Sequence, residues 1–168
     1  MSPPPRCVLD SNVFMEAARR YYSFDLVPSF WRSLTDHAEE GAVESIDRVK
    51  AEIDRGDDSL VAWANRDFHR WFISTSQADV IEAYGEAMLW AHSQVQFTDA
   101  AKAEFSRAEN ADAWVVAYAR AKGYVVVTQE QFDPNIRRKI PIPNACRALS
   151  VPYVDTFQML RDLGVRLS

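Results

Sequence analysis

The sequence has little cysteine, little histidine and no long hydrophobic run. Its two cysteines, Cys7 and Cys146, stand far apart and form no zinc-type spacing, so a disulfide framework or a structural zinc site has little support. The histidines His37, His69 and His92 also lack ligand spacing, which argues against a catalytic histidine. No window approaches the roughly 18 apolar residues of a transmembrane helix, and the N-terminus lacks the apolar core of a signal peptide. We therefore expect a cytoplasmic protein with no membrane partner.

The sequence also lacks an excess of positive charge. It contains 24 acidic and 19 basic residues, for a formal net charge of −5. No general cationic field would draw such a chain to RNA, DNA or an anionic membrane, so any nucleic-acid contact must be local or metal-assisted. The phosphate-cradle, dinucleotide and serine-hydrolase motifs are missing as well.

The sequence contains enough apolar residues for one domain of ordinary size, and its strand-like and helix-like segments alternate. The 168 residues are 48% hydrophobic, which predicts a single domain over residues 1–168. The segments that read as strands are residues 6–10, 42–45, 124–128 and 151–154. The segments that read as helices are residues 27–41, 46–56, 111–123, 146–150 and 155–164, together with a helical insertion or clamp over 57–96. This alternation predicts an α/β fold of three layers, with a mostly parallel sheet flanked by helices.

Carboxylates gather where these segments meet. Asp10 ends the first strand, and Glu130 lies two residues past the strand at 124–128. Asp112 starts the helix that leads into that strand, and we expect it at the same edge if the preceding chain arrives from there. Ligands of open parallel sheets bind at the carboxyl ends of the strands. Clustered carboxylates repel one another, and a divalent cation is the simplest compensation; oxygen ligands suit Mg²⁺ or Mn²⁺.

The segment CVLDSNVF resembles the opening motif of PIN domains, and ENADAWVVAYARAKGYVVVTQE resembles their third and fourth motifs. More narrowly, PSFWRSL, VKAEI, DDSLVAW, NADAWVVAYA and IPNACRALSVPYVDTFQML are similar to the DUF4411 branch of PIN-like proteins. The resemblance runs from about residue 6 to residue 163. It implies a PIN-like fold within the superfamily of VapC-like toxin ribonucleases.

The resemblance also implies a metal site. Its metal-binding and catalytic carboxylates would be Asp10, Glu52, Asp112 and Glu130. Glu44 competes with Glu52 for the second motif and ranks below it. The family commonly has Thr-x-Asp at the fourth motif, whereas this chain has Thr128-Gln129-Glu130, so Asp133 could substitute for Glu130. Asn12 and Thr128 would hydrogen-bond to the carboxylates and hold their rotamers.

The activity implied by the resemblance is hydrolysis of RNA by a Mg²⁺- or Mn²⁺-dependent endoribonuclease, which leaves a 3′-hydroxyl and a 5′-phosphate. Arg137, Arg138 and Lys139 could contact RNA phosphates, although a short basic run is also typical of a solvated turn. Many PIN proteins are toxins, which implies a protein antitoxin and often a homodimer. The aromatic residues Tyr21, Tyr22 and Phe24 are either a partner surface or a loop folded onto the core.

Other interpretations stay open. Asp112 could simply cap or charge a helix start, and Glu130 could be a solvated loop charge. The fold could serve as a catalytically weak module that binds a partner. A phosphatase of the haloacid dehalogenase type needs a second Asp where this chain has Asn12, and a phosphoacceptor module needs an Asp that ends a middle strand, which we do not find.

Overall fold

The centre of the protein is a parallel sheet. The computed structural model describes residues 5–168, so residues 1–4 of the predicted domain lie outside the described residues. The strands within this range are β1 (Cys7–Leu9), β2 (Val43–Ile46), β3 (Phe72–Ile73), β4 (Val125–Val127) and β5 (Tyr153–Val154). Their order is β3-β2-β1-β4-β5, and every neighbouring pair is parallel. The predicted α/β fold with a parallel sheet is therefore confirmed.

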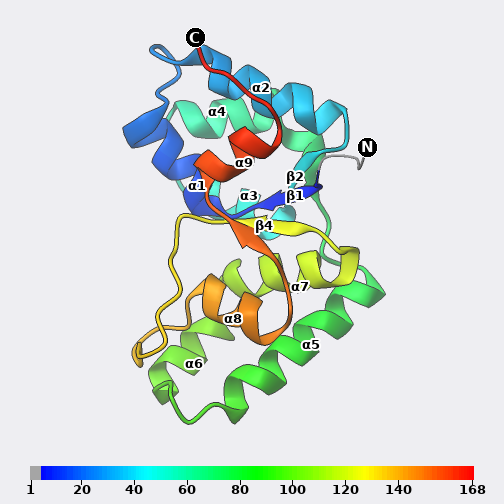
Figure 1. The fold of residues 1–168 in the computed structure, drawn as a ribbon, viewed down its shortest axis with the longest axis vertical. Helices are drawn as coiled ribbons and strands as arrows, with labels where there is room; N and C mark the ends of the chain where they lie inside the picture. Colours follow the sequence, from blue (N-terminus) through cyan, green and yellow to red (C-terminus); the bar gives the residue numbers. More distant parts are fainter. Residues whose placement is uncertain (1–4) are drawn as a thin grey trace.

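Helices cover both faces of the sheet, as Figure 1 shows. The helices before residue 110 are α1 (Ser11–Glu16), the π-helix η1 (Ala17–Tyr21), α2 (Pro28–Glu39), α3 (Asp47–Ile53), α4 (Ser59–Arg66), the 3₁₀-helix η2 (His69–Trp71), α5 (Ala78–Ser93) and α6 (Asp99–Phe105). The later helices are α7 (Asp112–Lys122), α8 (Ile142–Ala148) and α9 (Thr156–Asp162). In Figure 1, α2, α4 and α9 lie on one side of the sheet, and α5, α6, α7 and α8 lie on the other.

The α7–β4 unit is the most deeply packed part of the chain. Every residue of α7 from Ala113 to Ala119 is buried, because this helix lies between the sheet and α5. The helix ends at Gly123, whose φ of 74° is in the left-handed region that glycine adopts without a Cβ clash. The chain then enters β4, where Val126 and Val127 are fully buried. Burial on both faces explains the dense β-branched sequence, as expected for a central parallel strand.

Two elements differ from the sequence prediction. Residues 57–96 were expected to be a helical insertion, and this is wrong at Phe72–Ile73, which form β3 and pair with β2. A strand of two residues is too short to show an alternating pattern, and it lies within the aromatic run FHRWFI. Helix α6 was not predicted, although Thr98 accepts a hydrogen bond from the Ala101 amide and caps it.

Cys7 and Cys146 are both buried and unpaired in the described part of the chain. Between residues 5 and 168, no helix combines the length and the apolar character needed to cross a membrane.

Candidate active site

The carboxyl ends of β1 and β4 bring the candidate residues together. Asp10 directly follows β1, and the Asp10 amide donates a hydrogen bond to the carbonyl oxygen of Val127 at the end of β4, at 3.0 Å. Thr128 and Glu130 follow β4. Because α7 leads back into β4, the helix begins at this same edge, with Asp112 as its first residue. The sheet order thus places residues more than 100 positions apart side by side.

Asp10 is a fully buried carboxylate held by hydroxyl groups. Thr128 Oγ1 donates to Asp10 Oδ2 at 3.2 Å, and Ser11 Oγ approaches Asp10 Oδ1 at 3.4 Å. The side chain does not cap α1 in the usual way, through the amide of the second or third helical residue. Burial, followed by the negative charge of Glu130, raises the pKa of Asp10 to about 7, although the hydrogen bonds from Thr128 and the Ser11 amide act in the opposite direction.

Asp112 faces the same acidic cluster. Its backbone amide is capped by Asn110 Oδ1 at 2.9 Å, and the N-cap residue is Ala111, so the Asp112 carboxylate does not cap its own helix. Burial raises its pKa well above the usual range, and the charges of Asp10 and Glu130 add to the effect. Because α7 begins at Asp112 and leads into β4, which lies next to β1, the topology places Asp112 at the predicted edge.

Glu52 joins the cluster from α3, whereas its competitor Glu44 does not. Ser11 Oγ lies 3.4 Å from Glu52 Oε1 and equally far from Asp10 Oδ1, so one hydroxyl bridges the two carboxylates. Burial raises the pKa of Glu52. Glu44 lies within β2, before the strand end, and accepts a hydrogen bond from the Tyr118 hydroxyl. The geometry therefore favours Glu52.

Glu130 is already compensated within the protein. Lys139 Nζ contacts Glu130 Oε2 at 3.2 Å, and the Ile142 amide donates to Glu130 Oε1 at 3.1 Å. The Glu130 amide in turn donates to Thr128 Oγ1 at 3.1 Å, so Thr128 links Glu130 to Asp10. Burial would lower the pKa of Lys139, but the attraction of Glu130, with smaller contributions from Asp112 and Asp10, raises it. Lys139 is thus a counter-charge for the acidic cluster.

Two predicted supporting residues lie elsewhere. Asp133 is exposed, accepts a hydrogen bond from the Asn135 amide at 2.9 Å and stabilises its own turn. Asn12 makes no side-chain hydrogen bond to the residues between 5 and 168, and it lines a shallow pocket with Glu16 and Arg19. Ser11 makes the contacts expected of Asn12. Its position beside Asp10 in LDSN was a signal for this role that the sequence analysis overlooked.

The three residues of the predicted basic run, 137–139, differ in how close they lie to the acidic cluster. All three residues are exposed, and Lys139 contacts Glu130. Arg138 and Lys139 also line a small pocket together with Asp112. Two of the three basic residues therefore border the acidic cluster.

The cluster contains the type of ligands that bind a divalent cation, but their present positions do not form a complete coordination shell. Within residues 5–168, Asp10, Glu52 and Asp112 form no ion pair with Lys or Arg; the cations that act on them from further away are Lys139 for Asp112, and Arg55 and Arg107 for Glu52. In their present positions, no three His, Cys, Asp or Glu side chains in this range lie close enough together to hold a metal ion. The available donors are carboxylate and hydroxyl oxygens, which suit a hard divalent cation.

Comparisons with known proteins agree with this architecture. The family model described as "Domain of unknown function (DUF4411)" matches residues 7–167. The fold is similar to that of FitAcB from Neisseria gonorrhoeae, with a TM-score of 0.53 and 16% identity over 88% of this chain and 95% of that one. It is also similar to VapBC2 from Rickettsia felis bound to a DNA fragment from their promoter, with a TM-score of 0.56 and 13% identity over 89% of this chain and 97% of that one. The search of curated proteins gives no match. Because the family model spans nearly the whole chain and the parallel sheet matches both structures, the protein belongs to the DUF4411 family and has a PIN-like fold.

Proposed function

We propose that the protein is a metal-dependent endoribonuclease that hydrolyses phosphodiester bonds in RNA, and that it is the toxin of a toxin–antitoxin pair. One observation carries the catalytic part of the proposal. Asp10, Glu52 and Asp112 come together at the carboxyl edge of the sheet, and burial raises the pKa of each of them. Perturbed carboxylates that cluster at such an edge are typical of functional sites.

Mg²⁺ or Mn²⁺ is the cation that these donors fit. Asp10, Glu52 and Asp112 would hold it, and Glu130 would contribute after exchanging its contact with Lys139. A bound divalent cation lowers the pKa of coordinated water and neutralises charge on the scissile phosphate.

The surrounding residues would orient the acids and the substrate. Thr128 and Ser11 hold the Asp10 carboxylate from its two oxygens. Lys139 would offset part of the negative charge that the acids present to an incoming phosphate. The exposed Arg137 and Arg138 would contact the RNA backbone.

The toxin part of the proposal is supported by the structural neighbours. FitAcB and VapBC2 share the fold, and VapBC2 was captured on a DNA fragment from its promoter. We propose by analogy that an antitoxin protein binds this chain and blocks its site, and that the chain forms a homodimer. Co-expression with the neighbouring gene product, followed by a growth-rescue assay, tests the antitoxin directly. Growth arrest on expression of the chain alone, relieved by that product, is expected; no arrest in any tested host would contradict the toxin role.

A catalytically weak binding module is the second candidate, because Lys139 and the Ile142 amide already satisfy both oxygens of Glu130. The two functions are separated by incubating purified protein with single-stranded RNA and single-stranded DNA, in Mg²⁺, in Mn²⁺ and in EDTA. The Asp10→Asn and Asp112→Asn variants serve as tests, and Asp36→Asn on the exposed surface of α2 serves as the matched control. We expect metal-dependent RNA cleavage by wild type and Asp36→Asn, and a loss of at least 100-fold in the other two variants. Equal cleavage by all four proteins, or none by folded wild type, would reject the nuclease.

A further inference from the structure

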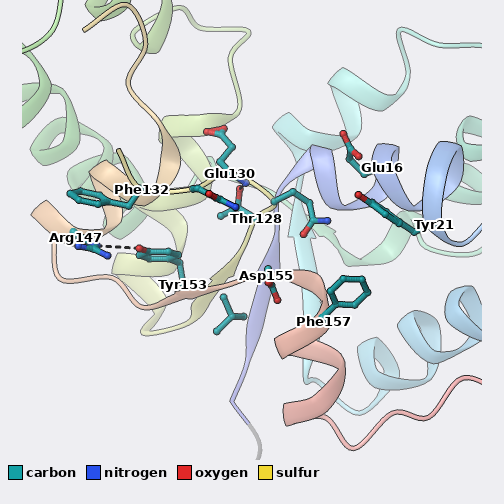
Figure 2. Close-up of a pocket in the computed structure, with 12 residues that line it drawn as sticks. Glu16, Tyr21, Thr128, Glu130, Phe132, Arg147, Tyr153, Asp155 and Phe157 are labelled. Carbon is teal, nitrogen blue, oxygen red and sulfur yellow. Dashed lines mark hydrogen bonds between the residues drawn. The ribbon is translucent and has the colours of Figure 1, made fainter. Parts of the chain in front are cut away.

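A cleft lies beside Glu130, at one end of the acidic cluster. It has a volume of about 610 Å³ and is bordered by Thr128 and Glu130, which follow β4, and by Tyr153 and Asp155 at the end of β5. The cleft is therefore outside the carboxyl ends of the strands, where parallel sheets bind ligands. Its volume is in the range of small-molecule and cofactor sites, roughly 300–1,000 Å³. Figure 2 shows Thr128 and Glu130 between two walls of aromatic side chains.

One wall carries an exposed aromatic pair. Tyr21 on η1 and Phe157 on α9 are 49% and 47% exposed, and their ring centroids lie 6.3 Å apart in an edge-to-face arrangement. Among the exposed large hydrophobic residues of the described chain, these two are the aromatic ones, and both line this cleft. Tyr21 also contacts Tyr22, which stacks on the buried Phe30, so the pair is anchored to the core. Two rigid rings are thus presented to solvent next to the acids.

The opposite wall carries a fixed cation. The Arg147 guanidinium carbon lies 3.7 Å from the centroid of the Phe132 ring, and Arg147 Nε donates to the Tyr153 hydroxyl at 3.1 Å. In Figure 2 these three side chains lie together, across the cleft from Tyr21 and Phe157. Stacking and one hydrogen bond orient the guanidinium but leave its terminal nitrogens available. Such a group suits an oxyanion with planar, two-pronged geometry.

The charges along the cleft favour this use of Arg147. Two of the three acids on the walls are paired with a cation: Glu16 lies 3.7 Å from Arg20, and Glu130 contacts Lys139. Asp155 keeps its negative charge, although the Gln158 amide donates a hydrogen bond to it. Arg147 makes no ion pair with any residue between 5 and 168, so its charge is available to a phosphate, although the cleft as a whole is not basic.

We propose that this cleft binds the unpaired nucleotides next to the scissile phosphate of a single-stranded RNA, with bases stacked on Tyr21 and Phe157 and a phosphate on Arg147. The inference deepens the proposed nuclease function and rests on it for the position of the scissile phosphate. Exposed aromatic rings bind the flat faces of bases, which are accessible in single strands and hidden in a duplex. Because Arg147 is the one cation of this cleft that takes part, stacking supplies most of the binding within the cleft, and the cleft adds only about one phosphate contact to the salt dependence.

Binding is tested by fluorescence anisotropy with a labelled ten-nucleotide RNA, single-stranded or annealed to its complement. An Asp10→Asn background prevents cleavage. The cleft variants are Tyr21→Ala, Phe157→Ala, Phe157→Tyr and Arg147→Gln. The matched controls outside the cleft are Leu89→Ala, an exposed apolar residue of α5, and Arg161→Gln, an exposed arginine of α9. Circular dichroism and melting temperatures establish that each variant is folded.

We expect Tyr21→Ala and Phe157→Ala each to weaken single-strand binding at least about five-fold, as for the loss of one stacked base. Phe157→Tyr keeps the ring and should bind within about two-fold of its parent. Arg147→Gln should weaken binding and reduce the slope of log K against log salt by about 0.7, which is one phosphate contact on a single strand. The controls should bind as the parent does, and the duplex should bind more weakly than the single strand.

Cleavage by the same variants in the wild-type background separates this inference from the nuclease proposal. A raised KM with little change in kcat is expected for the aromatic variants, because they lose substrate binding and retain the acids. If wild type cleaves RNA and the aromatic variants bind and cleave like the controls, the cleft proposal is overturned and the nuclease stands. If wild type cleaves nothing but single-strand binding depends on Tyr21 and Phe157, the nuclease fails and the binding site stands. Equal binding of duplex and single strand would overturn the assignment to unpaired nucleotides.

Discussion

Asp10→Asn should stabilise the metal-free protein at alkaline pH, which is unusual for a substitution in a fully buried polar site. Burial and the charge of Glu130 raise the pKa of Asp10 from its ordinary value of 3.8 to about 7. This rise corresponds to at most about 4 kcal/mol of folding free energy that is lost when the group ionises. Asparagine is close to isosteric, still accepts the hydrogen bond from Thr128, and carries no charge at any pH.

The direction in which the free energy of unfolding changes with pH follows from which state, folded or unfolded, holds the proton on Asp10. Between about pH 4 and pH 7, the folded state keeps a proton on Asp10 that the unfolded chain has released. The free energy of unfolding of wild type therefore falls as the pH rises through this window, and the loss is complete above about pH 7. The pKa of Asp112 is raised for the same reason, so it steepens the fall. In Asp10→Asn the contribution of Asp10 disappears, and the two proteins should converge near pH 4.

The assay is urea denaturation at pH 5 and pH 8, in EDTA and in Mn²⁺. In EDTA at pH 8, Asp10→Asn should exceed wild type in unfolding free energy by up to about 4 kcal/mol, whereas Asp36→Asn should match wild type. Mn²⁺ should raise the stability of wild type, by about 2.7 kcal/mol at 100 times its Kd, and should have little effect on Asp10→Asn. If Asp10→Asn is less stable than wild type at pH 8 in EDTA, the electrostatic reasoning is refuted.

Two further predictions concern neighbours of the cluster, and a third concerns the core side of α7. Thr128→Val removes the hydroxyl that donates to Asp10, so it should raise the pKa of Asp10 further. The free energy of unfolding at pH 8 should fall by about 1–3 kcal/mol, which urea denaturation at pH 5 and pH 8 measures. Lys139→Met leaves Glu130 without its cation, so we expect lower stability in EDTA and a larger stabilisation by Mn²⁺ than in wild type; an unchanged response to Mn²⁺ would contradict the role of Lys139 as counter-charge. Trp114 Nε1 is buried without a hydrogen-bond partner among the described residues. Trp114→Phe removes this unsatisfied donor, so urea denaturation should show a change in the free energy of unfolding of no more than about 1 kcal/mol, whereas truncation of a buried Trp typically costs far more.

The parts of the fold that could be predicted are those whose local pattern matches their environment. The run VVV of β4 is β-branched because it is buried on both faces, and α7 ends at a glycine that adopts positive φ. Strand β3 could not be recognised, because two residues carry no period and their strand character depends on pairing with β2. The π-helical turn at Ala17–Tyr21, which presents Tyr21 to the cleft, also has no sequence signature that we can identify.

The site residues also differ in whether local sequence or tertiary packing determines their position. Asp10 and Asp112 could be placed from topology, because parallel strands end at one edge and the helix before a strand begins there. Glu52 was ranked above Glu44 from the family resemblance, whereas the physical reason, the rotation of α3 that brings Glu52 to Ser11, is visible only in the packed structure. The contact between Glu130 and Lys139 depends on the path of an irregular segment over nine positions, and no periodicity describes such a path. Ser11 was within reach of sequence reasoning, and its neighbour Asn12 was chosen in its place.

The most direct test of the central claim is an analysis of the RNA ends that the purified protein produces. A single-stranded RNA is incubated with wild type in Mg²⁺, in Mn²⁺ and in EDTA, beside Asp112→Asn and Asp36→Asn, and the product termini are identified. Water activated at a carboxylate-bound cation should leave 5′-phosphate and 3′-hydroxyl ends, in metal only, with wild type and Asp36→Asn active and Asp112→Asn inactive. Metal-independent products with 5′-hydroxyl and 2′,3′-cyclic phosphate ends, at equal rates in all three proteins, would contradict the account.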